Sequence, residues 1–200
     1  MKQSIPTIQS NKSSPLEHRG EFLNRINAQL APDSVCVEIG VKDGDFSKLI
    51  LDFIKPRKLY LIDPWEEGFD KNGETTHYSD HISHLPTAYS TDEEFSRIQS
   101  RFSSEESVEF KRGFSYDFID SFPDNYFDFV YIDGCHLYDC VKADLEGYFP
   151  KLKESGLMCG HDYQNQSNFG VIKAVDEFIE SYSFSWIGLG LDGDWALSKT

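Results

Sequence analysis

Short apolar runs alternate with stretches of helical periodicity along most of the chain, and this alternation restricts the fold more than any other feature. Strands have a side-chain period of two and helices a period of 3.6, so one pattern does not imitate the other over long segments. Strands separated by helices pair in parallel and carry the helices on both faces of the sheet. The predicted strands are 34–39, 59–62, 108–110, 129–132 and 157–159, and the predicted helices are 15–30, 45–54, 92–102, 137–148 and 171–182.

The end of the chain follows a different pattern. Residues 184–191 and 195–197 are two apolar runs joined at an Asp192-Gly193 turn, which predicts an antiparallel hairpin. The fold class is therefore α/β: a doubly wound sheet of about seven strands, mostly parallel, with an antiparallel hairpin at the C-terminus.

Two segments do not fit this alternation of strands and helices. Residues 1–14 are polar and without periodicity, which predicts a flexible tail. Residues 66–92 carry scattered glycine, proline and histidine, which predicts a lid or insert. The remainder, 15–200, is predicted to form one domain, a size that buries a sufficient core without disulfides.

Charge limits the partners of the chain. It has 34 acidic and 19 basic residues, a formal net charge of −15, which repels phosphate backbones and anionic lipid. We therefore expect neither a nucleic-acid nor a membrane partner. Four cysteines without paired spacing, together with no secretory signal, predict reduced thiols and a cytoplasmic location.

A glycine turn follows the first predicted strand, in the run Glu38-Ile39-Gly40-Val41-Lys42-Asp43-Gly44. Lys42 stands where a dinucleotide fingerprint needs glycine, so a pyrophosphate cofactor is disfavoured. Glu38 would repel phosphate and would suit a cationic cofactor group. Asp63 ends the next strand, where a carboxylate can accept both hydroxyls of a ribose.

With these features the chain resembles the class I S-adenosylmethionine-dependent methyltransferases, which carry E-x-G-x-x-x-G and an acid at the end of the second strand. The resemblance implies a Rossmann-like sheet and S-adenosyl-L-methionine as cofactor. It also implies that the glycine turn borders the methionine part, that the strand-end acid holds the ribose, and that neighbouring residues border the adenosine. The implied cofactor-binding residues are Glu38, Gly40, Gly44, Asp63, Trp65, Gly113, Ser115 and Asp133.

Acids and imidazoles gather after two later strands. Asp133 and His136 follow the fourth predicted strand, and His161 and Asp162 follow the fifth. Two carboxylates on adjacent strand ends can hold a hard divalent cation such as Mg²⁺. His136 is then placed to accept the proton of a substrate hydroxyl.

The run F-D-F-V-Y-I-D-G-C-H-L-Y, with G-H-D-Y later, is similar to the metal-dependent sugar O-methyltransferases of the macrocin and mycinamicin type. That resemblance implies Asp133 and Asp162 as metal ligands and His136 as general base. The family places two adjacent oxygen ligands after the second acid-bearing strand, whereas here His161 precedes Asp162 and Tyr163 follows it. The third ligand is therefore open, with His161 as the candidate, and a mixed site would suit Zn²⁺ or Mn²⁺ as well as Mg²⁺.

The predicted function is methyl transfer to a hydroxyl of a sugar or other small polar, natural-product-like acceptor, with a divalent cation assisting. One alternative is a metal-independent small-molecule methyltransferase, in which Asp133 contacts only cofactor or substrate. A second is a non-catalytic S-adenosylmethionine-binding module, and a third, disfavoured by Glu38 and Lys42, is a nicotinamide-dependent oxidoreductase.

Overall fold

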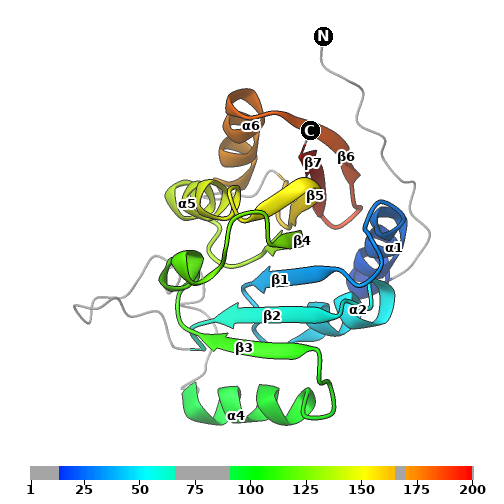
Figure 1. The fold of residues 1–200 in the computed structure, drawn as a ribbon, viewed down its shortest axis with the longest axis vertical. Coiled ribbons are helices and arrows are strands. Elements are labelled where there is room, and N and C mark those ends of the chain that lie inside the picture. The colour runs from blue at the N-terminus through cyan, green and yellow to red at the C-terminus, as the bar shows by residue number, and fades with distance from the viewer. Residues whose placement is uncertain (1–13, 66–90, 165–169, 200) are drawn as a thin grey trace.

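The computed structural model describes residues 14–65, 91–164 and 170–199, and the predicted tail and lid lie almost wholly outside them. Within these ranges the strands form one sheet in the order β3-β2-β1-β4-β5-β7-β6 (Figure 1). β1 to β5 pair in parallel, and β7 is antiparallel to both β5 and β6. The predicted fold class is confirmed. The strands are β1 (Val35–Ile39), β2 (Lys58–Asp63), β3 (Val108–Arg112), β4 (Phe127–Ile132), β5 (Leu152–Gly160), β6 (Phe184–Leu189) and β7 (Trp195–Lys199).

Helices cover both faces of the sheet. One hydrophobic layer contains side chains of α1, α2 and α4, and the other contains side chains of α5 and α6. Each helix presents one apolar stripe to the sheet, as a doubly wound fold requires. The helices are α1 (Pro15–Asn27), α2 (Asp45–Phe53), α4 (Thr91–Arg101), α5 (Tyr138–Tyr148) and α6 (Val171–Ser181), with 3-10 turns η1 (Ser115–Asp117) and η2 (Ile119–Ser121).

Element boundaries differ most from the sequence prediction at two places. α1 ends at Asn27 and not near residue 30, because the chain turns there through Ala28. β5 begins at Leu152, earlier than predicted, and runs through Gly156. Its register against β4 shifts between the Phe127 and Phe129 pairs, so the added residues form an irregularity that local pattern does not reveal.

Strand alternation decides which side chains reach which helix layer. In β4, Val130 and Ile132 belong to the α5 and α6 layer, whereas Phe129 and Tyr131 belong to the layer of α1 and α2. Because successive side chains point to opposite faces, Asp133, which follows the strand, continues on the α1 and α2 side. The same alternation places the Glu38 side chain of β1 on that side.

The glycine turn after β1 lies directly against the end of β4. Gly40 has φ of 84°, and a Cβ built on it would lie 2.5 Å from the Cα of Gly134 and closer still to the carbonyl of Asp133. The Gly40 amide donates to the Ile62 carbonyl at 2.9 Å, so the turn is held between β2 and β4. Glycine is required here by backbone packing as well as by conformation.

We predict that Gly40→Ala lowers the free energy of unfolding by roughly 1–3 kcal/mol, because the new methyl group overlaps the β4 backbone and the residue has a positive φ. Urea denaturation measures this. Gly134→Ala is the matched control, since the atom nearest to its new Cβ would belong to the Ile39 side chain, at 3.7 Å. Equal stability of the two variants would show that the turn adapts.

Candidate active site

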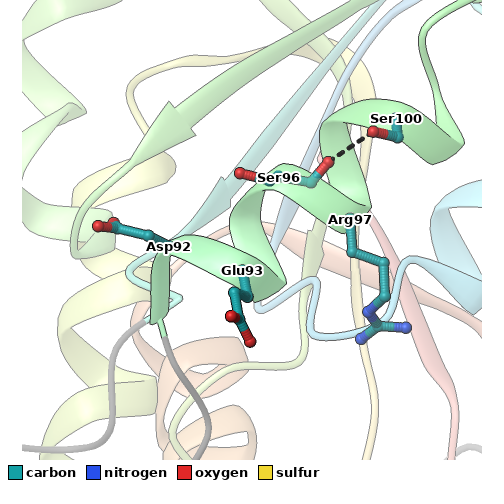
Figure 2. A pocket seen from close by; sticks show the side chains of 5 residues that line it. All are labelled: Asp92, Glu93, Ser96, Arg97 and Ser100. Atoms are coloured by element: carbon teal, nitrogen blue, oxygen red, sulfur yellow. Dashed lines mark hydrogen bonds between the residues drawn. The ribbon is translucent and has the colours of Figure 1, made fainter.

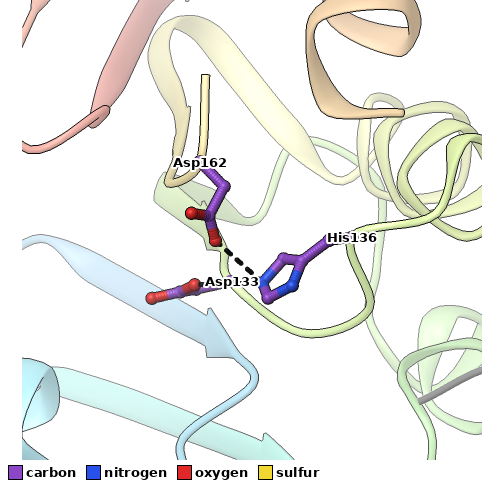
Figure 3. Close-up of side chains that lie close together, drawn as sticks. All are labelled: Asp133, His136 and Asp162. Carbon is purple, nitrogen blue, oxygen red and sulfur yellow. Dashed lines mark ion pairs between the residues drawn. The ribbon is translucent and has the colours of Figure 1, made fainter. Parts of the chain in front are cut away.

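Two carboxylates and an imidazole meet where β4 and β5 end (Figure 3). The Nε2 atom of His136 lies 2.9 Å from Asp162 Oδ2 and 3.7 Å from Asp133 Oδ1, so the imidazole faces both acids. All three side chains are largely buried, with 25%, 10% and 17% of the side-chain area exposed for His136, Asp162 and Asp133. The structure therefore brings together the predicted catalytic residues and both predicted carboxylate ligands.

A second imidazole contacts the same acids. The Nδ1 atom of His161 lies 3.2 Å from Asp162 Oδ2 and 3.7 Å from Asp133 Oδ1, and its Nε2 lies 3.7 Å from Asp192 Oδ2. Its position follows from the sheet, because the β4 and β5 register, continued by one residue, pairs Asp133 with His161. The His161 amide donates to the Ile132 carbonyl at 3.1 Å and keeps that register.

Asp162 reaches His136 because the chain turns sharply after β5. Asp162 has φ of 58°, a left-handed conformation that aspartate tolerates better than most residues. Its carbonyl accepts the Gln164 amide at 2.8 Å. Asp133, by contrast, is not a helix cap, because α5 begins at Tyr138 with Leu137 as its N-cap and no side-chain cap bond.

The acids shift the pKa of both imidazoles upward. Burial opposes the charged form of His136, but its contacts with Asp133 and Asp162 outweigh it and raise its pKa to about 9. The pKa of His161 is also raised: burial opposes this, and the contact with Asp162 and the charge of Asp133 prevail. Burial would raise the pKa of Asp162, yet its hydrogen bonds with both histidines hold it well below the usual range. The cluster therefore favours protonated imidazoles beside an ionised Asp162.

Glu38 lies under the glycine turn and is 1% exposed. The Ser47 hydroxyl of α2 donates to Glu38 Oε2 at 2.5 Å. Burial raises the pKa of this carboxyl to about 8, although the Ser47 hydrogen bond lowers it. A cation placed beside Glu38 would favour its ionised form.

Asp63 organises the glycine turn. Its Oδ2 accepts the amides of Val41 and Lys42 at 2.8 and 3.0 Å, and its Oδ1 accepts the amide of Trp65 at 2.6 Å. The Trp65 residue is 3% exposed and its ring packs against Phe95, with 4.9 Å between ring centroids. Asp63 therefore lies beside the turn, while contact of either residue with a cofactor stays a prediction.

The loop after β3 contains the two remaining predicted cofactor residues. The Gly113 amide donates to the Asp63 carbonyl at 3.1 Å, which ties this loop to the end of β2. The Ser115 hydroxyl donates to Asp144 of α5, and the Tyr148 hydroxyl donates to the Ser115 carbonyl at 2.9 Å. Burial raises the pKa of Asp144 to about 7, against the lowering effect of Ser115.

The acid and imidazole cluster fits a divalent cation. Asp133, His136 and Asp162 each offer one ligand atom, and these atoms all lie within 4.8 Å of one another. Carboxylate oxygens suit Mg²⁺ or Mn²⁺, and an added imidazole also suits Zn²⁺. This grouping contains His136, whereas the sequence assigned His136 to proton transfer and His161 to the metal, so that division of roles stays a prediction.

Comparison with known proteins identifies the family. A model of a methyltransferase-domain family matches residues 37–163, more than half of the chain. The chain belongs to this family. The match spans the glycine turn, the acid that ends β2 and the complete cluster after β4 and β5.

Solved structures share the fold of this methyltransferase. A protein from Corynebacterium glutamicum is 15% identical with a TM-score of 0.64, over 94% of this chain and 83% of the other. The O-methyltransferase NovP is 20% identical with a TM-score of 0.62, over 92% and 79%. Fibrillarin from Aeropyrum pernix, solved with natively bound S-adenosyl-L-methionine, is 11% identical with a TM-score of 0.53, over 83% and 65%. No curated protein matches the chain.

Sequence reasoning missed three residues beside the cluster, and two of them, Arg19 and Asp194, lie outside the family match. Arg19 of α1 contacts Asp133 at 2.7 Å, and Tyr131 and Asp194 complete a buried network around it. A signal existed for Arg19, because it precedes Phe22 and Leu23 by three and four positions and so shares their apolar stripe. A cation on an apolar stripe needs a buried partner.

Two structural observations concern regions outside the site. A shallow surface hollow on α4 is lined by Asp92, Glu93, Ser96, Arg97 and Ser100 (Figure 2), and it contains none of the predicted site residues. Among the residues that the structure describes, no helix is long and apolar enough to cross a membrane.

We predict a pH-dependent stabilisation by Glu38→Gln. The unfolded carboxyl ionises near 4.5 and the folded one near 8, so the wild-type free energy of unfolding falls as pH rises between these values. The Glu38→Gln variant has no carboxyl to ionise at this position, so its free energy of unfolding does not fall for this reason. Its stability relative to wild type should rise by on the order of 3 kcal/mol between about pH 5 and about pH 8.5, measured by urea denaturation.

The exposed residue Glu146 of α5 provides the control, and Glu146→Gln should follow the wild-type pH profile. A Glu38→Gln profile parallel to that of wild type would contradict a raised Glu38 pKa.

Proposed function

We propose that this methyltransferase is an S-adenosyl-L-methionine-dependent O-methyltransferase, acting on a hydroxyl of a sugar or similar small polar acceptor with a divalent cation. The observation that carries the proposal is the buried Asp133, His136 and Asp162 cluster next to the glycine turn. In open α/β sheets ligands bind at the carboxyl ends of the strands, where this turn and this cluster meet.

The cofactor side of the proposal rests on charge and on the family. S-adenosyl-L-methionine carries a ribose and cationic groups but no phosphate, which suits two acids beside a glycine turn. Glu38 and Asp63 are those acids, and the Gly113 and Ser115 loop lies tied to the same edge. Fibrillarin, of the same fold, binds this cofactor. We assign Asp63 to the ribose and the Ser115 loop to the adenine.

The acceptor side rests on the cluster and on the net charge. A formal charge of −15 favours a neutral or cationic small molecule over a nucleic acid. NovP, at 20% identity, is an O-methyltransferase. A neutral hydroxyl acceptor also needs a proton acceptor, and the imidazole of the cluster is a group of that kind.

Methyl transfer breaks the bond between sulfur and the methyl carbon while the acceptor oxygen forms the new bond. The hydroxyl proton must leave during or before this step. We assign it to Nε2 of His136, the atom that faces both acids, once this imidazole is neutral. Asp162, 2.9 Å away, then stabilises the imidazolium. The remaining contribution of the protein is alignment of the two reactants.

Asp133 and Asp162, with His161, are the residues that would hold a cation, which leaves His136 to the proton transfer. Such an ion would polarise the acceptor hydroxyl and compete with the imidazole protons for the same carboxylates. If a bound cation displaced the imidazole proton, His136 would be neutral and able to take the proton of the substrate hydroxyl.

The deciding experiment incubates the protein with S-adenosyl-L-methionine and a panel of sugars and glycosides, with Mg²⁺, and detects methylated products by mass spectrometry. We predict that His136→Gln lowers kcat by ~10²–10⁴-fold, because the proton acceptor is lost. Binding of S-adenosylhomocysteine, measured by calorimetry, should remain. Cofactor binding without turnover on any acceptor would instead support a non-catalytic binding module.

We predict that Asp162→Asn weakens binding of Mn²⁺ at least ~10-fold, because a carboxylate at the centre of the cluster is lost. Calorimetry with Mn²⁺ alone measures this, and S-adenosylhomocysteine binding should not change. Asp139→Asn, at an exposed acid of α5, is the control. Equal Mn²⁺ affinity of wild type and both variants would contradict the metal site.

A metal-independent methyltransferase is the second candidate, and one observation favours it. Arg19, His136 and His161 already place positive charge beside Asp133 and Asp162. Unchanged turnover after treatment with a chelator would select this candidate.

A further inference from the structure

Arg19 lies on α1, outside the family match, yet its guanidinium contacts the cluster. Its Nη2 lies 2.7 Å from Asp133 Oδ2 and donates to the Tyr131 hydroxyl at 2.6 Å. Its Nε lies 3.3 Å from Asp194 Oδ1. The side chain is 13% exposed, so these contacts take place mostly out of water.

The partners of Arg19 are themselves fixed. The Tyr131 hydroxyl donates to Asp194 Oδ1 at 2.5 Å, and the Asp194 side chain is fully buried. The guanidinium carbon lies 4.1 Å from the centre of the Phe46 ring, which is stacked on Tyr131 with 3.9 Å between ring centroids. A planar guanidinium held by stacking and by several acceptors has little freedom, which a lysine could not reproduce.

The two oxygens of Asp133 consequently face different partners. Oδ2 is bound by Arg19, whereas Oδ1 lies 3.7 Å from both His136 Nε2 and His161 Nδ1. Rotation of this carboxylate would break the Arg19 contact. The orientation of Asp133 toward the cluster is therefore set by a residue of the first helix.

We propose that Arg19 is a positioning residue that orients Asp133 for cation binding and so makes α1 part of the active site. This inference rests on the proposed function. The competing interpretation is purely structural, with Arg19 present only to neutralise the buried Asp194.

A double variant separates the two interpretations. Arg19→Met alone leaves Asp194 buried without its cation and can prevent folding. Arg19→Met combined with Asp194→Asn removes the buried charge of Asp194 as well. We therefore expect the double variant to fold, while Asp133 loses its contact with Arg19. Asp194→Asn alone keeps the contact between Arg19 and Asp133. Arg25→Met is a control on the same helix, because Arg25 donates to the Leu189 carbonyl and not to the cluster.

The readouts are Mn²⁺ affinity, measured by calorimetry without substrate or cofactor, and S-adenosylhomocysteine affinity. We expect the double variant to bind Mn²⁺ at least ~10-fold more weakly than Asp194→Asn, as is typical when a partner of a metal ligand is lost. S-adenosylhomocysteine affinity should stay the same, and Arg25→Met should resemble wild type. Equal Mn²⁺ affinity of the double variant and Asp194→Asn would overturn the positioning role of Arg19 and would leave the proposed metal site standing. Absence of Mn²⁺ binding by wild type would overturn the metal part of the proposed function, and this inference with it.

Discussion

The parallel register of β1, β4 and β5 is the constraint on which the rest of the site depends. Ile39 pairs with Ile132, and Ile132 pairs with Gly160. Continued by one residue, this register brings Gly40, Asp133 and His161 into one row at the carboxyl edge. Because parallel strands all end at the same edge, three segments distant in sequence deliver the turn, the acid and the imidazole together.

Close packing at that edge makes charge compensation necessary. Asp133, Asp162 and Asp194 are all at least four-fifths buried, and each lies against a cation or an imidazole. Buried carboxylates without such partners would cost several kcal/mol, on the order of 3–5 for a broken pair. The same contacts that allow these acids to be buried also orient them, so stability and the geometry of the site share their residues.

The fold was largely predictable because hydrophobic periodicity is a local property. Every predicted strand and helix within the described residues exists, and the reversed strand was anticipated from the Asp192-Gly193 turn. The early start of β5 was not predicted, because the irregularity in this strand depends on its pairing with β4. The ring of Trp65 packs against Phe95, and its predicted contact with a cofactor stays a prediction.

By itself, the sequence determined the order of elements, the glycine turn and the acids at the strand ends, because each of these is written in a few neighbouring residues. Only the tertiary structure decided that His136 faces both acids and that Arg19 binds Asp133 across 114 positions of the chain. Contacts between distant segments depend on register and on helix packing, neither of which a local pattern encodes. The residues of the candidate site could therefore be named from the sequence, whereas the tertiary structure decides which partners each carboxylate contacts.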